Sequence, residues 1–161
     1  MPDIDDTDTT EKHGHLKTWA ARVEIEELKA CYARRSDAVF RTPGAASALA
    51  LADLFTADGV LDLGPYGRFE GRAALLDAFE NLLPLGTQWS THYISSPVIT
   101  IDGDDATGSW YYLIKSVPKS PPGSPTSAVI DLIGGYEDRY RRVGGVWRIR
   151  ETLTSFFVPP A

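Results

Sequence analysis

Residues 88–117, QWSTHYISSPVITIDGDDATGSWYYLIKSV, decide the fold of this chain. Apolar and polar residues alternate through most of this stretch, which is the pattern of a β-strand with one buried face. Asp102-Gly103-Asp104 interrupts the alternation, and glycine adopts a positive φ without steric cost. The stretch therefore predicts a hairpin of two long antiparallel strands, 88–101 and 106–117.

The same alternation continues toward the C-terminus and predicts two more strands, 127–142 and 146–158, joined by a tight turn at Gly144-Gly145. A proline-rich segment, 118–125, separates the two hairpins. Proline has no N–H to donate to a strand ladder, so we expect this segment to be a loop.

Helical periodicity comes before the strands. It predicts helices over residues 18–39 and 45–55, a short strand at 60–63, and a third helix from Gly71 that ends at Pro84. Helices followed by antiparallel strands indicate an α+β fold. We expect a curved antiparallel sheet wrapped around three N-terminal helices and enclosing a pocket, although an ordinary filled core fits the same order.

Composition narrows the functional classes. The 161 residues suit one domain, and the net charge of −6 argues against a nucleic-acid partner. No apolar stretch is long enough for a membrane helix, and a single cysteine indicates a reducing compartment. The first 12 residues carry −4 of the charge, so we expect an acidic flexible tail over residues 1–17, a single domain over 18–161, and a cytoplasmic protein.

His92 is the one histidine within the expected domain, because His13 and His15 fall in the tail. It lies on the predicted strand 88–101, where a histidine is often a structural residue held by hydrogen bonds. A catalytic role would require a partner. The chain has no cluster of ligands at metal spacing, so we expect no metal and no cofactor.

Asp37 is the best candidate for that partner. It lies near the end of the first predicted helix, where the helix dipole disfavours a carboxylate. A surface ion pair with Arg34 or Arg41 is the simpler interpretation. Tyr32 is a further candidate, but five residues place it about 140° from Asp37 around an ideal helix.

Several further residues are candidates for substrate binding. The aromatic ones have core packing as their alternative, and the carboxylate stands in an apolar strand where it would need a partner. They are Phe55, Tyr66, Phe79, Trp110, Tyr112 and Asp131.

Motifs spread from about Trp19 to Phe157 resemble the SnoaL-like family of the nuclear transport factor 2-like (NTF2-like) superfamily. No single motif is diagnostic, but their order and spacing together are fairly specific. They are Ile25-(x2)-Leu28-(x3)-Tyr32-(x4)-Asp37, Leu54-Phe55-(x2)-Asp58-Gly59-Val60, Gly67-Arg68-Phe69-Glu70-Gly71-Arg72, His92-(x4)-Pro97-Val98-Ile99-(x1)-Ile101-Asp102-Gly103, Ala106-(x1)-Gly108-(x1)-Trp110-Tyr111, Gly135-Tyr136-(x1)-Asp138-(x1)-Tyr140 and Gly145-(x1)-Trp147-Arg148-Ile149.

The resemblance implies a cone-shaped fold around a deep pocket, in which Asp37, Tyr32 and His92 hold the positions that do the chemistry in dehydratase members. The sequence also departs from those members. Ile114 stands where bile acid dehydratases have an acidic residue, and no histidine follows His92 as in scytalone dehydratase. The arginine that some members carry on the last strand has no clear counterpart near Phe156.

These observations predict a cofactor-independent lyase of the dehydratase type, acting on a small hydrophobic cyclic, aromatic or steroid- or polyketide-like substrate. The alternatives are an isomerase or retro-aldol lyase using the same pocket, or a non-catalytic ligand-binding or assembly subunit. Analogy with the family predicts a homodimer or homotrimer.

Overall fold

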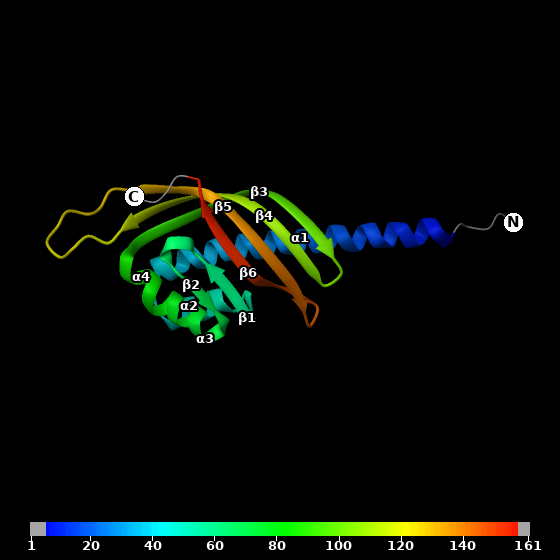
Figure 1. Cartoon of the computed structure of the whole chain (residues 1–161), viewed down its shortest axis with the longest axis horizontal. Coiled ribbons are helices and arrows are strands. Elements are labelled where there is room, and N and C mark those ends of the chain that lie inside the picture. The colour runs from blue at the N-terminus through cyan, green and yellow to red at the C-terminus, as the bar shows by residue number, and fades with distance from the viewer. Residues whose placement is uncertain (1–5, 158–161) are drawn as a thin grey trace.

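The computed structural model describes residues 6–157, with side chains from residue 14 onward. One curved sheet of six strands, in the order β2-β1-β6-β5-β4-β3, arches over the helices (Figure 1). Its strands are β1 (Phe55–Asp62), β2 (Arg68–Glu70), β3 (Thr87–Asp102), β4 (Asp105–Pro118), β5 (Ile130–Val143) and β6 (Val146–Phe156).

The four long strands pair antiparallel in chain order, which confirms the two predicted hairpins. Gly103 and the Gly144-Gly145 pair have positive φ at the two turns, as the sequence predicted. The short strands differ from the expectation. β1 begins at Phe55 and lies parallel to β6, and β2 was not predicted, so the sheet is mixed.

Helix α1 (Asp6–Arg41) runs beneath the sheet, and its N-terminal part projects beyond the sheet (Figure 1). The remaining helices gather at the other end, below the arch. They are α2 (Ala45–Ala52), the single turn η1 (Gly64–Tyr66), α3 (Gly71–Asp77), the π-helical segment η2 (Ala78–Leu82) and α4 (Leu83–Gly86). Sheet and helices thus form the two layers of an α+β fold.

Three helix boundaries differ from the sequence prediction, and one of them is the end of α2, which lies at Ala52 rather than at residue 55, where β1 begins. α1 begins at Asp6 rather than near Thr18. Residues 6–17 of the expected tail are therefore helical. The third helix passes through a π turn and continues beyond Pro84, which lies in the first turn of α4 where its missing N–H costs nothing.

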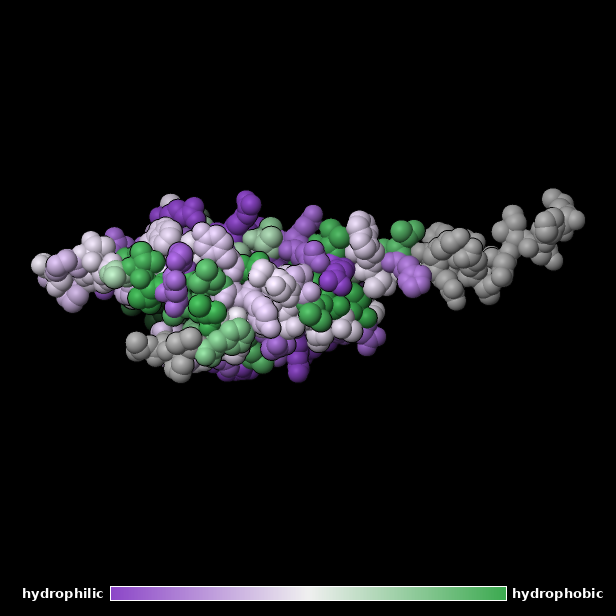
Figure 2. Space-filling view, turned by 90° about the horizontal axis from the view of Figure 1, so that it is seen from above, coloured by the Kyte–Doolittle hydropathy of each residue, from purple (hydrophilic) through white to green (hydrophobic). Residues whose placement is uncertain are grey.

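The core lies between the concave face of the sheet and the helices α1, α2, α3 and η2. Inward and outward side chains alternate along β4, as the period of two predicted. The outer face exposes some aromatic side chains, among them Tyr93 and Tyr111, and Figure 2 shows apolar and polar residues interspersed on the surface seen from above. Among residues 6–157, every helix is too short or too polar to cross a bilayer.

Residue 134 on β5 has to be glycine, because its neighbours pack too closely to leave room for a side chain. A Cβ atom at this position would overlap the carbonyl oxygen of Ser155 and the phenolic oxygen of Tyr112. Tyr112 itself donates a hydrogen bond to that carbonyl oxygen at 2.9 Å. A side chain at residue 134 would therefore separate β5 from β6 or displace Tyr112.

Replacing Gly134 by alanine should lower the free energy of unfolding by about 1–3 kcal/mol, the usual cost of overpacking a core. Gly14→Ala is the matched control, because Gly14 lies on the exposed surface of α1 with nothing within 4 Å of an added Cβ. Alanine favours the helix there, so that variant should be up to about 1 kcal/mol more stable. Thermal unfolding measures both, and equal melting temperatures for the two variants would contradict the packing analysis.

Burial of Tyr112 predicts an alkaline loss of stability. Removal from water raises the pKa of its phenol from about 10 to about 12. The unfolded chain therefore ionises first, and the free energy of unfolding falls as the pH rises from about 10 to about 12, by less than about 1.4 kcal/mol per pH unit. Urea unfolding of wild type and Tyr112→Phe across this range should give a shallower slope for the variant, and identical slopes would refute the assignment.

Candidate active site

A cavity of about 620 Å³ lies between the concave face of the sheet and the helices. His92, Ile114 and Leu132 are register partners on β3, β4 and β5, so their side chains lie side by side on its wall. Most of the other lining residues are apolar, including Leu51, Leu61, Phe69, Phe79, Leu83 and Phe156. The cavity predicted from the order of elements is therefore present, and its lining suits a largely apolar ligand.

Asp37 and His92 are in direct contact. The Nδ1 atom of His92 lies 2.7 Å from Oδ1 of Asp37, and the backbone N–H of His92 donates to the same oxygen at 2.9 Å. Thr91 donates its hydroxyl to the other carboxylate oxygen at 3.2 Å. The carboxylate of Asp37 is placed to accept a hydrogen bond from Nδ1 of His92. The opposite ring nitrogen, Nε2, is then free to contact a ligand in the cavity that His92 lines.

Tyr32 and Asp37 point in different directions from α1, as their spacing of five residues predicted, and they face different neighbours. Tyr32 lines the cavity directly, whereas Asp37 is not part of the lining and reaches β3 from the side of α1. His92 lies between Asp37 and the cavity. Tyr32 and His92 therefore line the same cavity, with Asp37 in contact with His92, and α1 continues without interruption to Arg41.

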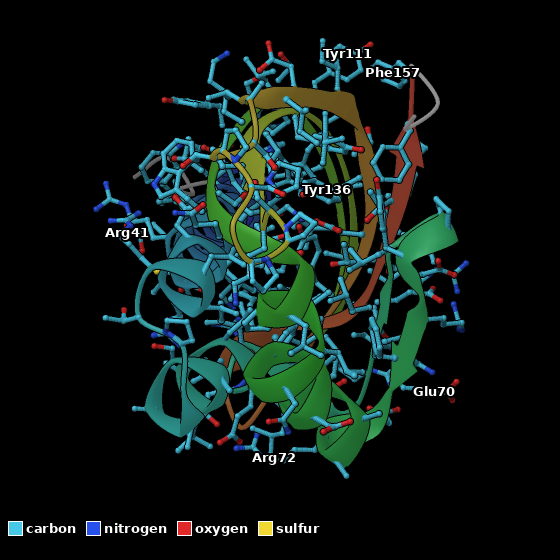
Figure 3. All side chains as sticks on the ribbon, turned by 90° about the vertical axis from the view of Figure 1, so that its left-hand side faces the viewer. Arg41, Glu70, Arg72, Tyr111, Tyr136 and Phe157 are labelled. Carbon is cyan, nitrogen blue, oxygen red and sulfur yellow. The ribbon has the colours of Figure 1, made fainter. Side chains whose placement is uncertain are left out.

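The surface ion pair considered for Asp37 is also present, but it is loose. Arg41 approaches the carboxylate to 3.7 Å, and 63% of its side chain is exposed. Figure 3 shows Arg41 at the outside of the molecule. Screening by solvent weakens such a pair, whereas the side chains of Asp37 and His92 are about nine-tenths buried.

Tyr32 is buried on the inner face of α1, with its ring edge-on to Phe55 and to Tyr136. Burial raises the pKa of its phenol, and the negative charge of Asp138 raises it further. Hydrogen bonding with Ser36 and Tyr136 acts in the opposite direction. Tyr32 is therefore a neutral phenol at physiological pH and can donate a hydrogen bond into the cavity.

The six candidates for substrate binding divide into three groups. Tyr66 and Phe79 line the cavity. Phe55, Trp110 and Tyr112 are buried in the core and lie outside the cavity lining. Asp131 is exposed on β5, where Lys115 pairs with it at 2.8 Å, so its partner lies on the surface.

Tyr136 is a cavity residue that the sequence analysis did not select. It is buried on β5, and Figure 3 shows it inside the arch of the sheet. Ser36 and Ser90 add hydroxyl groups to the lining. The period of two along β5 placed Tyr136 on the inner face, but periodicity alone does not separate a cavity wall from filled core.

Two departures from the dehydratase pattern also lie in the cavity. Ile114, at the position where the resemblance led us to expect an acidic residue, is the register partner of His92, and Phe156 lines the cavity from β6. The position directly across from His92 on β4 is therefore apolar, while Ser90 and Ser116 place hydroxyl groups two residues away on the same wall. Within the part of the chain that the structure describes, no three His, Cys, Asp or Glu side chains gather as metal ligands would.

Solved structures with a similar fold are described with different activities. A structure from Novosphingobium aromaticivorans, described provisionally as an aromatic ring hydroxylase, is 26% identical, with a TM-score of 0.71 over 86% of this chain and 90% of its own. A hexachlorocyclohexane dehydrochlorinase, LinA type 2, is 20% identical, with a TM-score of 0.74 over 91% and 93%. A protein described provisionally as a scytalone dehydratase, also from N. aromaticivorans, is 19% identical, with a TM-score of 0.70 over 87% and 86%.

A search of the curated proteins finds no match. The family model of the SnoaL-like domain, in contrast, matches residues 17–152, which is most of the chain. This match confirms the resemblance seen in the sequence, and the fold is shared with an NTF2-like protein described as having a cystatin-like fold. The chain belongs to the family of proteins with a SnoaL-like domain.

Proposed function

We propose that this protein is a cofactor-independent lyase of the dehydratase type. The contact of 2.7 Å between Asp37 and His92, at the wall of a largely apolar cavity, carries the proposal. A carboxylate bound to Nδ1 fixes the tautomer of a histidine and stabilises its protonated form. The ring is thereby prepared to take a proton at Nε2.

In the first step, Nε2 of His92 removes a proton from a carbon next to a carbonyl group. The electron pair of that C–H bond moves into the carbonyl, and an enolate forms. Asp37 stabilises the imidazolium, while Tyr32, which burial keeps protonated, donates a hydrogen bond to the enolate oxygen.

In the second step, the enolate re-forms the carbonyl and expels the hydroxyl group from the adjacent carbon. His92 returns its proton to the leaving oxygen, so one water molecule departs and the enzyme regains its starting state. The net reaction converts a β-hydroxy carbonyl compound into an unsaturated carbonyl compound and water, with no redox change.

The aromatic and aliphatic lining, including Phe69, Phe79 and Phe156, favours a hydrophobic cyclic substrate. An isomerase or a retro-aldol lyase would begin with the same proton transfer. An assembly subunit has no need of a buried Asp–His pair. The pair therefore supports an enzyme.

The bicyclic ketone 3-hydroxy-1-tetralone is a suitable probe, because loss of water yields 1-naphthol, which is detected by its fluorescence. His92→Ala should abolish turnover, since removing a general base costs about 10²–10⁴-fold. Asp37→Asn should also slow kcat, because it removes the negative charge beside the imidazolium. His15→Ala is the matched control, since this histidine is exposed on α1.

Wild-type turnover by His92→Ala would refute the assigned base. Exchange of deuterium from solvent into carbon 2 without loss of water would replace the dehydratase with an isomerase. If the protein binds cyclic β-hydroxy ketones of similar size but catalyses neither loss of water nor exchange in any of them, the result would favour a ligand-binding protein.

A further inference from the structure

A buried lysine lies directly beneath the cavity wall. Lys29 is on α1, one helical turn before Tyr32, and only 1% of its side chain is exposed. Its ammonium group forms an ion pair at 2.7 Å with Asp138 of β5, whose side chain is fully buried. The proposed reaction assigns no role to this pair.

The ammonium group also contacts two aromatic faces. Its nitrogen lies 4.5 Å from the ring centre of Tyr32 and 3.9 Å from that of Tyr136. These distances are within the range of cation–π attraction. Both tyrosines line the cavity, so the ammonium group packs against two rings that are part of the cavity wall.

Asp138 is held from its other side by side chains of the sheet. Tyr140 donates its hydroxyl to Oδ2 of Asp138 at 2.5 Å, and Trp110 donates its indole N–H to the oxygen of Tyr140 at 3.0 Å. The carboxylate is thus fixed by residues of β4 and β5. Through it, the position of Lys29 on α1 is fixed relative to the sheet.

Stability alone does not account for this arrangement. Removing two charges from water costs free energy that a single ion pair often fails to recover, and apolar residues of similar size are often at least as stabilising. Oδ1 of Asp138 has no hydrogen-bond partner among the described residues, so the pair is incompletely satisfied. Its placement against Tyr32 is the feature that apolar residues would not reproduce.

We infer that Lys29, held by Asp138, is a positioning residue that orients the Tyr32 hydroxyl toward the oxygen atom of the ligand. The inference rests on the proposed function and extends it to a pair of residues that do not touch the substrate. The ammonium group of Lys29 lies over the face of the Tyr32 ring, and the ring of Tyr136 packs nearly perpendicular to it, with ring centres 6.0 Å apart.

The variant Lys29→Met/Asp138→Asn removes both charges and keeps an oxygen that can accept from Tyr140. We expect kcat for 3-hydroxy-1-tetralone to fall roughly 10- to 100-fold with little change in KM, because misplacing a donor weakens mainly transition-state stabilisation. The same change in a Tyr32→Phe background should have no further effect. Arg141→Met/Asp105→Asn, at an exposed ion pair, is the matched control.

Ligand binding tests the same inference independently of turnover. The probes are 1-naphthol and naphthalene, which differ by one hydroxyl group. The pair variant should bind 1-naphthol about tenfold more weakly, the range expected for one lost hydrogen bond, while naphthalene affinity stays unchanged. Tyr32→Phe should show the same loss, and combining the changes should add nothing.

Equal weakening for both probes would mean that the pair only supports the fold, and losses that add to those of Tyr32→Phe would mean that it acts elsewhere. Wild type binding both probes equally would also overturn the inference, because Tyr32 would then donate to neither. If wild type binds 1-naphthol selectively but never eliminates water, the proposed reaction fails and the positioning role is retained.

A milder variant serves if the double variant does not fold. Tyr140→Phe removes one hydrogen bond to Asp138 and should show a smaller selective loss of 1-naphthol affinity. An unchanged 1-naphthol affinity in that variant would overturn the inference.

Discussion

The carboxylate of Asp37 is the contact on which the site depends. It accepts hydrogen bonds from the backbone and ring of His92 and from Thr91, so one side chain joins the C-terminal half of α1 to β3. The contact fixes the orientation of His92 at the place where helix and sheet enclose the cavity. Without this contact, the imidazole ring would have no carboxylate to fix its tautomer and orientation on the largely apolar wall.

A second link between the same layers lies two turns earlier on α1. Lys29 meets Asp138 on β5, and the two contacts therefore tie α1 to both β3 and β5. Tyr32 lies between them in the chain and lines the cavity. The helix thus presents Tyr32 between two anchored positions, which is an arrangement suited to holding a hydrogen-bond donor still.

The long strands and both hairpins were predictable because alternation and glycine turns are local signals. The short elements were not. β1 and β2 are too short to establish a period, and the parallel pairing of β1 with β6 is a long-range contact. Asp37 and His92 were selected from the sequence, but only the packing of α1 on β3 brings residues 55 positions apart together.

The lining of the cavity was the least predictable part. Inward-facing aromatic residues look alike in sequence, yet Phe79 borders the cavity while Trp110 and Tyr112 fill the core. Phe79 lies on η2 and the other two lie on β4, so the way the helices pack against the sheet decides which side chain has empty space beside it. The buried charge left a partial signal, because Lys29 lies four residues after Ile25 and three before Tyr32 on one face of α1, but only the structure places Asp138 opposite it.

The orientation of the His92 ring is the central claim, and ¹⁵N NMR of the imidazole nitrogens measures it directly. The signals of His92 are assigned by their absence in His92→Ala, at a pH where the ring is neutral. The geometry predicts a proton on Nδ1, donated to Asp37, and an unprotonated Nε2 facing the cavity. A proton on Nε2, or a mixture of tautomers like that of free imidazole, would contradict the assignment of His92 as the base.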